Sequence, residues 1–105
     1  MVRSLEAPVP GQQATAVDRA FMKQMYVFLR NRIDGGHRLS ADLGWLAMQA
    51  RLEGCSAEDQ NVADAVAVLL ELGILARTQD GYLELNRAAR KMDLYDSPTF
   101  RRLNS

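Results

Sequence analysis

Residue types that could carry out chemistry are sparse in this 105-residue sequence. Its one histidine, His37, lies in the stretch GGHR, and its one cysteine, Cys55, excludes an internal disulfide and fits a reducing cytoplasm. Neither residue has a second ligand at the spacing of a zinc or haem site. DGG at 34–36 lacks the lysine and the strand-to-helix context of a phosphate-binding loop. The sequence therefore predicts no catalytic residue, no metal ligand and no cofactor in this chain.

Charged residues are more informative, because they sum to zero but are unevenly distributed along the chain. Residues 1–39 hold six Lys/Arg and three Asp/Glu, which gives +3, whereas residues 40–85 hold two and eight, which gives −6. Residues 86–105 hold five and two, or +3. A free-standing nucleic-acid binder is usually clearly basic, so the charge counts against that class. The central acids form no paired set for a divalent cation, and we interpret them as solvated.

Three stretches of the sequence have apolar residues at helical spacing. The first predicted helix covers about residues 15–33, and the second covers about residues 40–53 with Ser40 as its N-cap. Ser56 is the predicted N-cap of the third helix. Asp59 then takes the N3 position, where a capping box has Glu or Gln.

Two short runs rich in β-forming residues follow the third helix. ILAR and YLEL are joined by TQDG, whose Asp80-Gly81 pair is a strong hairpin turn signal. Three helices and a two-stranded β-hairpin wing are the elements of a winged helix-turn-helix. We therefore predict an α+β, mainly α domain of this type over residues 15–105. A linker or ordered arm, residues 1–14, precedes it, with two prolines and a glycine.

The third predicted helix would normally be a candidate for the major groove of DNA. It carries Glu58, Asp59 and Asp64 near its start, with no Lys or Arg, so it repels phosphate. Acids at a helix N-terminus are also favoured by the helix dipole and need no function. Gln60 and Asn61 can hydrogen-bond bases but have little electrostatic support. We expect that this helix does not read DNA.

The C-terminal tail, residues 87–105, is longer than a winged helix requires. Ser97-Pro98 is a helix-start pair, and the tail is predicted to dock onto the core through its apolar residues. These are Met92, Leu94, Tyr95, Phe100 and Leu103. The basic residues of the tail predict a site for an acidic partner beside an apolar notch. The candidate residues are Arg87, Arg90, Lys91, Tyr95, Phe100, Arg101 and Arg102, with Arg30, Arg32 and Arg38 as further candidates at the other end of the sequence.

The tail motif RKMDLYDSPTFRR resembles the close of the C-terminal domain of RecJ, the bacterial single-stranded-DNA-specific exonuclease. FMKQMYVFLRNR at 21–32 resembles the opening helix of that domain, and LLELGIL at 69–75 its helix-to-wing junction, so that the resemblance covers roughly residues 8–103. In this family manganese or magnesium belongs to a nuclease core with Asp-His-His type motifs, which this sequence lacks. The resemblance implies a non-catalytic accessory module for DNA repair and recombination. Its implied partners are the nuclease core and the tail of single-stranded-DNA-binding protein, with single-stranded DNA held weakly at most.

Two other functions remain open from the sequence. One is a small transcription regulator that binds duplex DNA as a dimer, and the other is a structural winged helix in an unrelated complex. No apolar run approaches the ~18–20 residues that span a membrane, and the N-terminus has no signal-peptide core. We therefore expect a cytoplasmic protein without a membrane partner.

Overall fold

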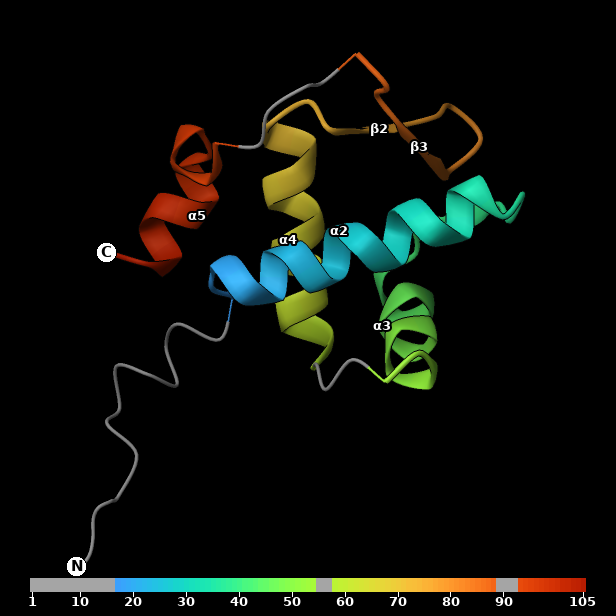
Figure 1. Ribbon diagram of the computed structural model, residues 1–105, viewed down its shortest axis with the longest axis horizontal. Coiled ribbons are helices and arrows are strands. Elements are labelled where there is room, and N and C mark those ends of the chain that lie inside the picture. Colours follow the sequence, from blue (N-terminus) through green and yellow to red (C-terminus); the bar gives the residue numbers. More distant parts are fainter. Residues whose placement is uncertain (1–16, 55–57, 89–92) are drawn as a thin grey trace, which may run out of the picture.

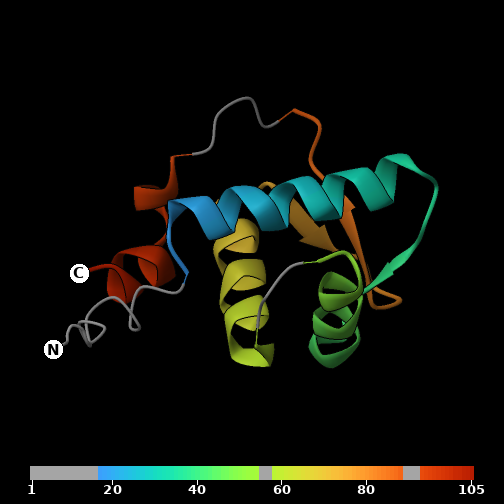
Figure 2. The ribbon, with the colours of Figure 1, turned by 60° about the horizontal axis from the view of Figure 1, so that its bottom comes forward.

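The computed structural model describes residues 17–54, 58–88 and 93–105, which form a mostly helical α+β domain (Figure 1). In chain order the elements are α2 (Arg19–Asp34), β1 (Leu39–Ser40), α3 (Leu43–Leu52), α4 (Asp59–Glu71), β2 (Leu75–Arg77), β3 (Tyr82–Leu85), the 3-10 turn η1 (Leu94–Asp96) and α5 (Pro98–Leu103). In Figure 2, α2 lies across α3 and α4, which run side by side beneath it. No helix within the described ranges is both long and apolar enough to cross a bilayer.

Helix α2 begins at Arg19, because the Asp18 carboxylate accepts a hydrogen bond of 2.9 Å from the Phe21 amide and satisfies one of the free amides of the first turn. The predicted start near Thr15 lies outside the described residues. The helix ends at the Gly35-Gly36 pair, where Gly36 has a φ of 86° that side chains rarely adopt.

Helix α3 begins three residues later than predicted, and Ser40 is not its N-cap. Asp42 takes that role, since its carboxylate accepts hydrogen bonds from Gly44 and Trp45 at 3.0 and 3.3 Å. Ser40 lies instead in β1, opposite Tyr82 of β3, and its hydroxyl accepts from the Asp42 amide at 3.0 Å. The local capping signal of Ser40 was overridden by strand pairing, which the sequence pattern did not predict.

Helix α4 also differs at its start. Its N-cap is Glu58, which makes no side-chain capping bond, and Asp59 is the first helical residue and not N3. The predicted cap, Ser56, lies outside the described residues. Asp59 instead forms an ion pair of 3.0 Å with Arg51 at the end of α3. The early acids of α4 are thus compatible with its dipole, and one of them also joins two helices.

The sheet has the order β1-β3-β2, and both pairs of strands are antiparallel. The predicted hairpin is confirmed: Leu75 lies opposite Leu85 and Arg77 opposite Leu83. Gly81, with a φ of 87°, allows the turn between its strands. Strand β1 has two residues, which is too short to give a periodic pattern in the sequence.

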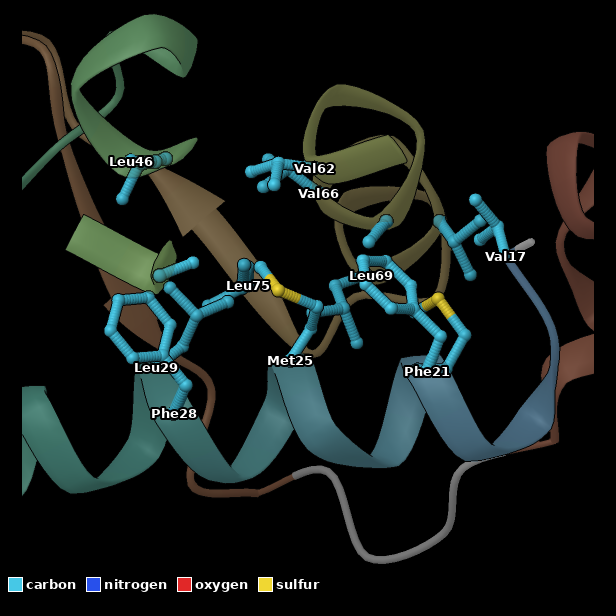
Figure 3. Close-up of a cluster of buried hydrophobic side chains, with 14 of the residues drawn as sticks. Val17, Phe21, Met25, Phe28, Leu29, Leu46, Val62, Val66, Leu69 and Leu75 are labelled. Carbon is cyan, nitrogen blue, oxygen red and sulfur yellow. The ribbon is translucent and has the colours of Figure 1, made fainter. Parts of the chain in front are cut away.

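The core lies where α2 faces α4, α3 and the sheet (Figure 3). Phe21, Met25 and Leu29 point from α2 toward Val66 and Leu69 of α4 in this view. This stripe follows the helical spacing of apolar residues in both elements, so the sequence pattern predicted it. It brings together residues that are about 40 positions apart in the chain.

The C-terminal tail packs against this core, as predicted, but Tyr95 does not dock as expected and is 49% exposed, and Met92 lies outside the described residues. Leu94 and Phe100 are each 2% exposed and belong to the buried cluster. Ser97 caps α5 by accepting a bond of 3.1 Å from the Phe100 amide, and Pro98 follows at the first helical position. Asn104 donates at 2.9 Å to the Val17 carbonyl before α2. The end of the chain is therefore fixed at both α4 and α2.

Candidate protein-docking site at the tail

The structure brings together some of the predicted site residues and separates others. Tyr95, Arg101 and Arg102 are exposed on the docked tail, whereas Phe100 is buried in the core. Arg90 and Lys91 lie outside the described residues. Phe100 therefore supports Tyr95 from below and does not line an open notch.

Arg87 lies at the opposite end of α2 from Tyr95. Its guanidinium pairs with the carboxylate of Asp34, the last residue of that helix, whereas Tyr95 contacts Arg19, the first residue. These two ends are about 22 Å apart at 1.5 Å per residue. Arg87 and Tyr95 thus do not share one rim.

A carboxylate from α4 holds the tail in place. Glu71, the last residue of α4, accepts hydrogen bonds from the Ser97 hydroxyl at 2.6 Å, from the Thr99 amide at 3.0 Å and from the Thr99 hydroxyl. We call this set of three residues the Glu71 latch. The Ser97 hydroxyl bond, followed by the bonds from Thr99, lowers the pKa of Glu71 below its ordinary value of 4.5. The negative charge of Glu71 interacts unfavourably with the dipole of α4, at whose C-terminus it lies, and favourably with the dipole of α5, whose N-terminus it faces.

Tyr95 is the exposed aromatic side chain of this region, at 49% exposure. Its ring meets Phe100 edge-on, with 5.2 Å between ring centres and 83° between planes. The Arg19 guanidinium lies 5.8 Å from the same ring, within the range of a cation–π contact. Arg101 donates to the Tyr95 carbonyl at 2.8 Å, which fixes this guanidinium beside the backbone of Tyr95. The result is an aromatic side chain with one ordered cation from α2 and another from α5.

Helix α2 extends this arrangement along its length. Arg19, Lys23, Tyr26 and Arg30 recur at i, i+4, i+7 and i+11, which places them along one line of the helix over about 17 Å. The Arg30 guanidinium lies 5.6 Å from the Tyr26 ring. No Asp or Glu occurs between residues 19 and 33. We call these four residues the α2 ridge. Of its cations, only Arg30 was a candidate from the sequence, and Arg19 and Lys23 were missed although their spacing was available as a signal.

Acidic residues also occur near Tyr95, but most of them serve the backbone. Asp18 caps α2, and Asp93 accepts from the Tyr95 amide at 3.1 Å. Asp96 is exposed in the same turn. The tail surface therefore mixes charges, while the α2 ridge has three cations and no acid.

The other basic candidates are paired within the domain. Arg32 forms an ion pair of 2.9 Å with Glu53, and Arg38 forms one of 3.2 Å with Asp80 and stacks 3.9 Å from the Tyr82 ring. A hydrogen bond from Thr78, and more weakly Arg38, lowers the pKa of Asp80. Each of these exposed ion pairs adds little stability. Their arginine side chains already have a carboxylate partner within the domain, so they are less available to an external acidic ligand.

His37 is exposed in the loop before β1, and Cys55 lies outside the described residues. Among the described residues no three His, Cys, Asp or Glu side chains are grouped as a metal site requires. Comparison of the chain with protein-family models, curated proteins and solved structures yields no significant match.

Proposed function

We propose that this chain is a non-catalytic docking module with a winged-helix fold, similar in role to the C-terminal domain of RecJ in DNA repair and recombination. The order helix, strand, helix, helix, strand, strand supports the winged-helix assignment, as does the pairing of β1 with β3. In this assignment α4 is the helix that a DNA-reading member would place in the major groove.

The observation that carries the proposal is the segregation of charge between two helices. Helix α4 has the sequence DQNVADAVAVLLE, with three acids and no cation, whereas α2 has four cations before its final Asp34. A phosphate backbone is repelled by the first surface, while an acidic protein segment is attracted by the second. The charge on α4 thus argues against groove reading and favours contacts between proteins.

The partner that this surface suits is an acidic peptide with an apolar residue at its end. The C-terminal tail of single-stranded-DNA-binding protein, implied by the RecJ resemblance, has this chemistry. Its carboxylates would face Arg19, Lys23 and Arg101, and its apolar end would pack on Tyr95. This set of residues replaces the site expected from the sequence, because Arg87 lies at the other end of α2.

Titration of a synthetic acidic peptide with an apolar C-terminus into isotope-labelled protein tests this proposal. We expect saturable amide shifts over residues 19–30 and 95–102 that weaken as salt is raised. Charge reversal by Lys23→Glu, on an exposed position of α2, should weaken binding. The matched control is Arg77→Glu, which reverses an exposed charge on β2. Shifts confined to the hairpin and α4, or equal effects of the two variants, would contradict the proposal.

A further inference from the structure

Helix α3 has large apolar side chains on two opposite faces. Its ten residues, LGWLAMQARL, include a single charged side chain, Arg51. The face toward the core consists of Leu46, Ala47 and Ala50, which are fully buried. A helix that is apolar on both faces is normally covered on both faces.

The second face consists of Trp45, Met48 and Leu52, spaced i, i+3 and i+7. At 100° per residue these three side chains fall within an arc of about 60°, opposite the buried face. Met48 is 46% exposed and Leu52 is 72% exposed, while Trp45, at the start of the line, is half-buried and packs partly against the core. A single exposed leucine is ordinary, but a line of large apolar side chains on one helix marks a binding surface.

The charges around this face are mainly acidic. At the end of α3 and the start of α4 there are four acids, Glu53, Glu58, Asp59 and Asp64, and two cations, Arg51 and Arg32. Arg51 pairs with Asp59 at 3.0 Å, and Glu53 at the end of α3 pairs with Arg32 at 2.9 Å. Glu58 and Asp64 remain as acids on the start of α4, the helix that runs beside α3 in Figure 2. A ligand for this face therefore needs apolar side chains together with cations.

A second copy of the chain does not meet this requirement. It would bring the same excess of acidic residues toward the first copy, which opposes association. A helix of ten residues is about 15 Å long, which is short for a stable dimer interface of ~1,200–2,000 Å². Charge and size both favour a smaller, basic segment of a partner protein.

We propose that the outer face of α3 docks a basic amphipathic helix from a partner protein. The apolar face of that helix would cover Met48 and Leu52, and its Lys and Arg side chains would meet Glu58 and Asp64. This inference rests on the proposed docking function, and it assigns the module a second surface of opposite charge preference to the α2 ridge. Methionine suits such a surface, because its flexible side chain adapts to different partners.

The test uses two synthetic peptides of about 15 residues, long enough for four helical turns. Both have leucines at helical spacing, and their remaining positions are lysine in one peptide and glutamate in the other. Titration into the labelled full chain is followed by backbone amide shifts. We expect the lysine peptide to saturate with shifts over residues 45–53 and 58–64, and the glutamate peptide to bind this face at least about tenfold more weakly.

The double variant Met48→Ser/Leu52→Ser should weaken binding of the lysine peptide by at least about tenfold. Both positions are exposed, so the fold should survive, which circular dichroism checks. Tyr95→Ser removes another exposed apolar side chain on the tail and is the matched control, with no expected effect on this peptide.

Equal binding of the two peptides, or an unchanged affinity of the double variant, would overturn the site on α3. Self-association of the free chain that the double variant abolishes would assign the face to a second copy and would also overturn it. The acidic peptide at the α2 ridge separates the two proposals: if it binds while the lysine peptide does not, the α3 site fails alone. If neither peptide binds, the docking function fails as well.

Discussion

Replacing Glu71 with alanine should destabilise the domain, because this carboxylate is the acceptor that holds the tail. The buried Ser97 hydroxyl would lose its acceptor, which costs about 1–3 kcal/mol, and the N-terminus of α5 would lose a nearby negative charge worth about 0.3–1 kcal/mol. Removing the negative charge from the C-terminus of α4 is favourable and offsets about 0.3 kcal/mol of this loss. We expect a net loss of about 2 kcal/mol in the free energy of unfolding.

This loss can be measured as a lower melting temperature. Unfolding entropy of about 2.1 cal/mol/K per residue gives about 220 cal/mol/K for 105 residues, so 2 kcal/mol corresponds to roughly 9 °C. Thermal unfolding of wild type and Glu71→Ala would be followed by circular dichroism at pH 7. Glu84→Ala is the matched control, because Glu84 is exposed on β3. If Glu71→Ala melted at the temperature of this control, the latch would contribute nothing and the reasoning would be refuted.

The same latch predicts a dependence on pH. The pKa of Glu71 is lowered in the folded protein, so its stabilisation is fully present above the ordinary value of 4.5 and is lost as pH falls through the folded pKa. The melting-temperature difference between wild type and Glu71→Gln should therefore be constant above about pH 5.5 and shrink in more acidic solution. A difference that stayed constant down to pH 3 would show that the charge of Glu71 is not what stabilises the tail.

Further predictions concern the tail and DNA. Truncation after Asn86 removes the buried Leu94 and Phe100, worth about 3–6 kcal/mol before ordering entropy is subtracted, so the melting temperature should fall; an unchanged curve would mean that the tail does not stabilise the core. Duplex DNA should bind at physiological salt no more tightly than the ~10⁻⁴–10⁻⁶ M of non-specific contacts, and a sequence-selective nanomolar shift in a gel assay would support a transcription regulator instead. The purified chain should not degrade single-stranded DNA with manganese or magnesium, and metal-dependent degradation that mutations in this chain abolish would contradict a non-catalytic role.

The sequence was a reliable guide to several features that depend on neighbours within a few residues, although two of the predicted helix caps were wrong. The turn at Asp80-Gly81 sets the hairpin register locally, and the apolar spacing of α2 and α4 defines the faces that form the core. The cap at Ser97 was likewise predicted, because serine followed by proline starts a helix without help from the rest of the chain. The sequence likewise specified the acidity of α4, which argues against a phosphate-binding surface on that helix.

The tertiary structure decided the features that depend on distant pairing. Ser40 could cap a helix or join a strand, and Tyr82, more than 40 residues away, decided for the strand. Glu71 carries no local signal of its role, because its donors Ser97 and Thr99 reach it only once α5 has packed against α4.

The candidate site shows the same division. The cations of the tail and of α2 are evident in the sequence, but their grouping is not. A local sequence pattern does not show which distant charged residues become neighbours in the folded chain. Packing placed Arg19 beside Tyr95, paired Arg87 with Asp34 at the other end of α2 and buried Phe100. Composition therefore determined which charges this protein carries, and the packing of the helices decided which of them form one surface.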